Sequence, residues 1–228
     1  ELWVNKLYRR GFNLIITGSN SRLLSNEMAS TLTGRYLQIN VHPFSFKEFV
    51  DYSGLKQSDV IALPSEIGKL SALFIQYQTF GGFPETVLNP AIHKNYLSSL
   101  FDSVLLRDIV KRFKIRQTQQ LYDLSVYLLS NYTNQYSFNQ LKADLGFNSV
   151  ATVQKFCSYL EESFLFYHLP RYDKKVKLQQ KSLRKCYIID NGFVKARSFE
   201  LSPNYGRLLE NLVFTELLRR GFIPGQSL

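Results

Sequence analysis

Residues 14–49 hold the pattern that most constrains the fold: a short apolar run, a polar cluster, a helical pattern and an alternating run. Leu14–Ile16 is too short for a helix and is typical of a strand buried on both faces. Thr17–Ser21 follows it as a cluster of small polar residues, and Leu37–Val41 alternates like a second strand. Ligands bind at the ends of parallel strands in open α/β sheets, so the polar cluster is a candidate ligand site. The alternative is a plain helix N-cap.

Three sequence blocks in this region, TGSNSRLLS, LTGRY and HPFSFKEF, occur in an order that carries a family resemblance. Together they resemble the second half of the module of a bacterial AAA+ superfamily ATPase, which is a P-loop NTPase. The resemblance implies that Thr17, Ser19 or Asn20 polarises the attacking water or the γ-phosphate of ATP. It also implies that Arg35 stabilises the charge that develops during hydrolysis, as an arginine finger does. A bridge from Arg35 to a carboxylate is the alternative.

The phosphate-binding part of such a module is not found in the chain. No G-x-x-x-x-G-K-[ST] motif occurs, and no apolar strand ends in Asp-Glu. The backbone N–H groups and the lysine of that loop are what hold Mg-ATP. We therefore expect a parent protein that uses ATP and Mg and whose N-terminal part is absent from this chain. The chain alone is expected to need no cofactor, to bind no metal and to be inactive as an ATPase.

The rest of the chain resembles the domain of unknown function that often follows this ATPase module in bacteria. The segments that carry the resemblance are GGFPE at residues 81–85, LLRDI at 105–109, YIIDNG at 187–192 and GRLLENLVFTELLRRG at 206–221. The glycines and proline of the first segment predict a sharp loop, interpreted as a hinge. In the resembled domain the last segment leads into a nuclease-like fold of the PD-(D/E)XK type, with its first acid at Glu210. One glutamate is not a metal site, so we expect no nuclease activity and a solvated or capping Glu210.

Hydrophobic periodicity is clearest in the second half of the chain. It predicts a first amphipathic helix, and Ser137 and Ser149 are suitable N-caps for a second and a third helix. Gly146 lies in the tight turn between these two helices. An aromatic, β-prone run at 164–169 and an apolar strand at 186–189 then predict a hairpin. Three helices followed by a two-stranded hairpin are the winged-helix arrangement, in which the third helix reads DNA.

The loop between the two predicted strands is basic and would form the wing. Cations of this kind bind a phosphate backbone by releasing counterions. The predicted DNA contacts are cations of the third helix and of this loop: Lys155, Arg171, Lys174, Lys175, Lys177 and Lys181. The third helix ends in Glu161-Glu162 and carries no arginine. A winged helix that serves as a docking platform for another protein therefore stays open as the alternative.

The bulk composition agrees with an intracellular protein that has an anionic partner. A net charge of +10 and a pI near 9.5 favour nucleic acid. Two cysteines do not suggest a disulfide framework, and no apolar run reaches the roughly 20 residues of a membrane span. We expect a cytoplasmic location and no membrane contact. The candidate partners are DNA, a protein partner or a second copy of the chain in a homo-oligomer.

These observations predict an α/β region followed by a mainly α region. The expected segments are the C-terminal part of an AAA+ module at 1–80, a helical linker at 81–116, a winged helix-turn-helix at 117–190 and the start of a truncated, nuclease-like α/β segment at 191–228. The expected function is that of a nucleotide-dependent switch whose winged helix contacts DNA. The alternative is a non-catalytic interaction scaffold.

Overall fold

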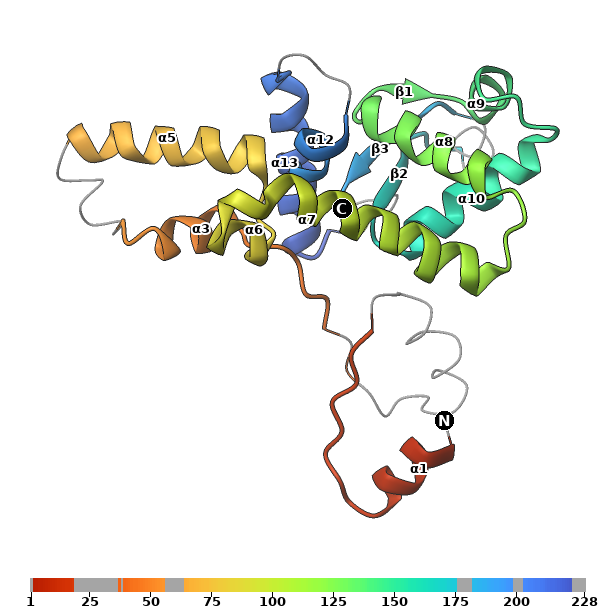
Figure 1. Cartoon of the computed structure of the whole chain (residues 1–228), viewed down its shortest axis with the longest axis horizontal. Coiled ribbons are helices and arrows are strands. Elements are labelled where there is room, and N and C mark those ends of the chain that lie inside the picture. The colour runs from red at the N-terminus through yellow and green to blue at the C-terminus, as the bar shows by residue number, and fades with distance from the viewer. Residues whose placement is uncertain are drawn as a thin grey trace.

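The computed structural model describes residues 2–18, 37, 39–55, 64–175, 182–198 and 203–222. This part of the chain is mostly helical, with one small sheet (Figure 1). The first group of helices is α1 (Leu2–Arg9), α3 (Phe46–Tyr52), α5 (Pro64–Phe80), α6 (Pro84–Leu88), the 3₁₀ turn η2 (Pro90–Ile92), α7 (His93–Ser103) and the π-helical η3 (Val104–Lys111). The second group is α8 (Thr118–Ser130), α9 (Phe138–Asp144), α10 (Val150–Glu162), α12 (Gly192–Arg197) and α13 (Tyr205–Arg219). None of these helices is long and apolar enough to cross a membrane.

The sheet is antiparallel, with the strand order β1-β3-β2. Its strands are β1 (Gln135–Tyr136), β2 (Phe166–Pro170) and β3 (Arg184–Ile188). In the central strand β3, Cys186, Tyr187 and Ile188 are all buried. They are buried on both faces because the ring of Tyr187 stacks on Phe214 of α13 at a centroid distance of 4.0 Å, while Cys186 and Ile188 join the hydrophobic core.

One hydrophobic core draws on α7, η3, α8, α9, α10, the sheet and α12. Leu97 and Phe101 of α7 are fully buried in it. Arg197 of α12 reaches back to the carboxylate of Asp102 (2.6 Å) and to the hydroxyl of Tyr122 (2.6 Å). The core therefore runs across the expected boundaries at residues 116 and 190, and the division into four segments stays a prediction.

The helices of the second half lie where the periodicity predicts them. The hydroxyl of Ser137 accepts the backbone N–H of Gln140 (3.1 Å) at the start of α9. The hydroxyl of Ser149 accepts the N–H of Thr152 (3.1 Å) at the start of α10. Between these helices Gly146 has a φ of 64°, a left-handed conformation that glycine adopts without strain. Local capping and turn chemistry thus set the boundaries of both helices.

The prediction of strands at Leu14–Ile16 and Leu37–Val41 is wrong. The described residues of both segments have no regular secondary structure, and Ile15, Leu37 and Val41 are 95%, 94% and 91% exposed. A strand is stable only where a neighbour satisfies its backbone N–H and C=O groups. No described strand lies beside either segment. Figure 1 shows α1 and the residues that follow it lying away from the helical body.

A buried carboxylate ties the glycine loop after α5 to the segment after β3. Asp190 accepts the backbone N–H of Gly82 and of Gly192, both at 2.7 Å. A Cβ atom at Gly81, where φ is +77°, would lie 1.7 Å from the Asp190 Oδ1 atom. A Cβ atom at Gly82 would lie 2.4 Å from the carbonyl oxygen of Phe44. Close packing against Asp190 and Phe44 therefore explains the double glycine, in place of the hinge interpretation. Burial raises the pKa of Asp190 to about 6.

Two buried asparagines complete this polar cluster. Asn211 of α13 accepts the N–H of Ile188 (2.9 Å) and donates to its carbonyl (3.0 Å) and to the side chain of Asn191 (2.9 Å). Asn191 in turn donates to the carbonyls of Gln78 (2.8 Å) and Leu208 (3.0 Å). Buried polar groups need such partners, so these bonds fix α13 against both β3 and α5.

Candidate nucleic-acid interface

Helix α10 has one face in the core and one face exposed. Val153, Phe156 and Leu160 are buried at the spacing of a helix stripe. On the outer face Gln154 and Lys155 are exposed. The predicted contact Lys155 is therefore accessible to a partner that approaches this face.

The loop between β2 and β3 presents a further set of cations. Arg171, Lys174 and Lys175 are exposed there. The backbone N–H of Arg171 donates to the carbonyl of Leu183 (3.0 Å), which extends the pairing of the two strands. The carboxylate of Asp173 accepts the backbone N–H of Lys175 (2.8 Å), an Asx-type turn that shapes the chain at the start of the loop. Two more predicted contacts lie outside the described residues: Lys177 and Lys181.

The cations that end this loop, Arg184 and Lys185, are engaged within the fold. The Arg184 guanidinium lies 4.5 Å from the ring centroid of Phe138, in cation–π range. The Lys185 Nζ atom lies 2.7 Å from the carboxylate of Glu210, which also accepts the hydroxyl of Tyr187 (2.9 Å). Glu210 thus joins α13 to β3 through an ion pair and a hydrogen bond, while its side chain stays partly solvated, at 38% exposed.

Helix α10 and the sheet carry one histidine and two cysteines. The hydroxyl of Tyr136 lies 2.5 Å from the Nδ1 atom of His168, and burial lowers the pKa of His168 to about 4. The imidazole is therefore neutral near pH 7, and its tautomer sets which partner donates this hydrogen bond. Cys157 and Cys186 are free and buried. Burial raises the pKa of the Cys157 thiol to about 12, so this thiol is not a nucleophile at neutral pH.

Of the four residues predicted to act on nucleotide, the structure describes Thr17, and its side chain is exposed. The other three lie outside the described residues: Ser19, Asn20 and Arg35. The described part of the chain contains no group of three or more His, Cys, Asp or Glu side chains placed to hold a metal ion. The assignment of these four residues to nucleotide therefore stays a prediction.

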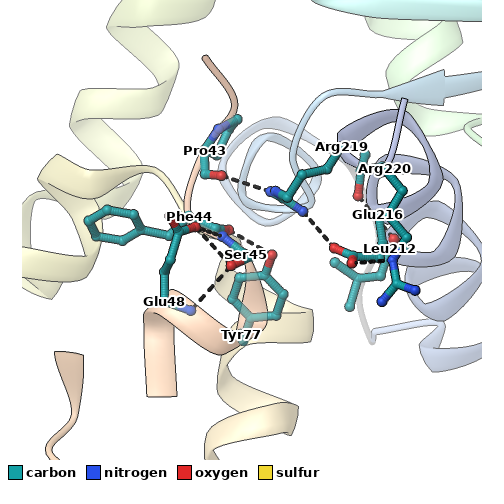
Figure 2. Close-up of polar contacts among 10 residues, drawn as sticks. Pro43, Phe44, Ser45, Glu48, Tyr77, Leu212, Glu216, Arg219 and Arg220 are labelled. Carbon is teal, nitrogen blue, oxygen red and sulfur yellow. Dashed lines mark hydrogen bonds and ion pairs between the residues drawn. The ribbon is translucent and has the colours of Figure 1, made fainter. Parts of the chain in front are cut away.

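The Pro43–Phe44 peptide is held by contacts from distant parts of the chain (Figure 2). The Nη2 atom of Arg219 donates to the carbonyl of Pro43 (2.8 Å), and the hydroxyl of Tyr77 donates to the carbonyl of Phe44 (2.8 Å). The N–H of Phe44 donates to the carbonyl of Gly82 (2.8 Å). We call these residues, Pro43, Phe44, Tyr77, Gly82 and Arg219, the Pro43 joint.

Two further sets of contacts lie beside the Pro43 joint. Directly after it, Ser45 and Glu48 form a capping box at the start of α3. Glu216 lies beside Arg219 (2.9 Å) and Arg220 (2.8 Å) and orients both guanidinium groups. Sequence reasoning missed Arg219 because its contact with Pro43 spans 176 positions of the chain. No local signal distinguishes it from the neighbouring Arg220.

Comparison with known families gives two matches. The family described as Domain of unknown function (DUF8612) matches residues 71–202, more than half of the chain. The chain belongs to this family. A family described as AAA domain matches residues 1–50, so an AAA-like region precedes the DUF8612 domain. The Pro43 joint connects the two, because Pro43 and Phe44 lie in the AAA-like region while Tyr77 and Gly82 lie in the DUF8612 domain.

Two curated relatives are similar to nearly the whole chain. An uncharacterized protein of Haemophilus influenzae is 35% identical over 226 residues, which are 96% of this chain and 54% of that protein. An uncharacterized protein of Methanocaldococcus jannaschii is 36% identical over 236 residues, which cover 100% of this chain and 52% of that protein. The chain spans about half the length of the curated relatives it matches. No solved structure matches it.

Proposed function

We propose that residues 118–188 of the DUF8612 domain are a winged helix that contacts DNA. The observation that carries this proposal is the element order α8, β1, α9, α10, β2, β3 together with the sheet order β1-β3-β2. A pair of helices joined by a tight turn places its second helix, here α10, in the major groove of DNA. The loop between β2 and β3 is then the wing, which lies along the phosphate backbone.

The charges support backbone contact more than base reading. Lys155, Arg171, Lys174 and Lys175 are exposed on α10 and the wing, and Lys177 and Lys181 belong to the same proposed contact set. Helix α10 carries one cation, and the exposed acid Glu161 lies in its last turn. Phosphate contacts position a protein on DNA, whereas base contacts give sequence specificity. We therefore expect salt-sensitive binding with little preference for sequence.

A nucleotide-dependent switch is proposed for a longer protein that contains this chain, and not for the chain alone. The match of residues 1–50 to an AAA domain supports it. ATP and Mg are its proposed cofactors, and the residues proposed to face the nucleotide are Thr17, Ser19, Asn20 and Arg35. A shift of the Pro43–Phe44 peptide would reach α5 through Tyr77 and α13 through Arg219. The Pro43 joint is thus the proposed connection between nucleotide state and DNA contact.

A second candidate function, a non-catalytic interaction scaffold, is favoured by one surface feature. On α13, Leu209, Val213 and Leu217 repeat every four residues and are 45%, 53% and 41% exposed. An exposed apolar stripe of this kind is typical of a helix that meets another protein surface. A second copy of the chain or a different protein would cover it.

The two candidates are separated by the binding of this chain to a fluorescein-labelled DNA duplex of random sequence. We expect log K to fall linearly with log salt between about 50 and about 200 mM. Lys174→Gln together with Lys175→Gln should lower the slope by about two, one for each lost phosphate contact. Lys94→Gln is the matched control, because Lys94 is an exposed lysine at the start of α7, outside the proposed interface.

Absence of binding by the unaltered chain at low salt would reject DNA contact. The scaffold function then makes its own prediction, which is concentration-dependent self-association or partner binding through α13. Light scattering on the unaltered chain and on Val213→Glu measures this, since a charge in the apolar stripe should abolish association. A mass that is the same for both proteins would count against a second copy of the chain as the occupant.

A further inference from the structure

Two aromatic rings join the end of the long α7–η3 helix to the exposed face of α10. The rings of Phe113 and Tyr159 stack at a centroid distance of 3.6 Å and an interplanar angle of 10°. A cation lies near each ring. The Arg112 guanidinium is 5.6 Å from the centroid of Phe113, and the Lys155 Nζ atom is 5.8 Å from the centroid of Tyr159. The stack therefore has one cation from each of the two elements beside it.

The segment that supplies Phe113 is densely basic. Four of the six residues from 111 to 116 are lysine or arginine, and no acid occurs from residue 109 to residue 122. The α10 side supplies one cation, Lys155, and residues 145–160 contain no acid. We call the following set the linker face: Lys111, Arg112, Lys114, Arg116 and Lys155. Within the described residues none of these five side chains forms an ion pair.

The backbone at this place also favours exposure of the cations. The π-helical η3 ends at Lys111, and π-helical turns are frequently found at functional sites. Lys114 has a φ of 51°, so the helix ends there in a left-handed residue. Lys111, Lys114 and Arg116 are exposed. Cations at a helix C-terminus are favoured by the macrodipole, but that effect does not require a second element to contribute Lys155 to the same surface.

We propose that the linker face is a second phosphate-binding surface for DNA, continuous with the recognition helix α10. This proposal rests on the winged-helix function proposed above and extends its contact set from the wing to the end of the α7–η3 helix. Cations on two elements that form no ion pair within the described residues suit an extended row of phosphates. DNA that contacts both elements would fix the α7–η3 helix against α10.

The test is a triple variant of the otherwise unaltered chain, which combines Lys111→Gln, Lys114→Gln and Arg116→Gln. All three side chains are exposed, so the fold should be kept, and thermal unfolding checks this. We expect the slope of log K against log salt for the random-sequence duplex to fall by about three. The affinity at about 100 mM salt should fall at least roughly tenfold. Lys94→Gln again serves as the control, with unchanged slope and affinity.

A second variant, Arg112→Gln with Lys155→Gln, removes the two cations at the aromatic stack. It should weaken DNA binding in the same direction and lower the slope by about two. Both linker-face variants are compared with the wing variant, Lys174→Gln with Lys175→Gln. If they bind DNA like Lys94→Gln while the wing variant binds DNA less tightly, the linker face is not a binding surface, and DNA contact through the winged helix is kept. If the unaltered chain does not bind DNA at low salt, both proposals are overturned.

Discussion

The AAA-like region and the DUF8612 domain use similar apolar runs with opposite results. In the DUF8612 domain the run Cys186–Ile188 is buried at the centre of the sheet. In the AAA-like region the run Leu14–Ile16 is exposed, and Ile15 has 95% of its surface in contact with solvent. Both runs are typical of a buried strand, but only β3 has a strand on each side. A strand therefore needs its neighbours as well as its sequence, because the backbone hydrogen bonds come from them.

The largest expected effect compares a buried leucine of the DUF8612 domain with an exposed isoleucine of the AAA-like region. Leu124 in α8 is fully buried, so Leu124→Ala should lower the free energy of unfolding by about 2–5 kcal/mol. Ile15→Ala should change it by less than about 0.5 kcal/mol, because Ile15 is exposed. Urea unfolding of both variants measures the difference. Equal losses would contradict the contrast between the two regions.

A second expected effect lies in the acid stability of the DUF8612 domain. Burial holds the pKa of His168 at about 4 in the folded chain, against an ordinary value of 6.5. The unfolded chain therefore binds the proton first, so stability that is present above pH 6.5 is lost as the pH falls towards 4. The shift corresponds to roughly 3 kcal/mol. His168→Gln should lose less stability than the unaltered chain between about pH 7 and about pH 4.5.

The measurement compares the unfolding free energies of His168→Gln and the unaltered chain, because Asp190 changes stability with pH in the opposite direction. Burial raises the pKa of Asp190 to about 6, so its contribution is present at low pH and is lost as the pH rises through 6. Both proteins contain Asp190, and its contribution cancels when their unfolding free energies are subtracted. Parallel pH curves for His168→Gln and the unaltered chain would contradict a neutral, buried imidazole.

The smallest expected effect tests the Pro43 joint with two neighbouring arginines. Both Arg219 and Arg220 pair with Glu216, but Arg219 also reaches the carbonyl of Pro43. Arg219→Gln should cost about 1 kcal/mol and speed hydrogen exchange at the Phe44 amide. Arg220→Gln should cost less than about 0.5 kcal/mol and leave that exchange rate unchanged, because its ion pair is exposed. The same exchange rate at Phe44 in both variants would mean that Arg219 does not hold the joint.

The sequence predicts the helices of the second half well because their signals are local. Ser137, Ser149 and Gly146 set boundaries through contacts within a few residues. The exposure of Lys155 also follows from helix periodicity alone. These features depend on neighbours that the sequence places close by, so pattern and capping rules are sufficient for them.

Features that depend on distant contacts could not be predicted in this way. The double glycine at 81–82 reads as a hinge until Asp190 is seen to pack against it. The basic run at 111–116 reads as an ordinary helix end until Phe113 is seen to stack on Tyr159. Glu210 likewise reads as a lone acid, although Lys185 lies 2.7 Å away from it. In each case the partner comes from another element of the fold.

The central claim, DNA contact through α10 and the wing, is tested most directly by lysine footprinting. The chain is acetylated with and without the random-sequence duplex, and the reactivity of each lysine is read by mass spectrometry. The account predicts that Lys155, Lys174 and Lys175 become protected in the complex while Lys47 and Lys94 react as before. Unchanged reactivity of the first three in a complex that still binds DNA would contradict it.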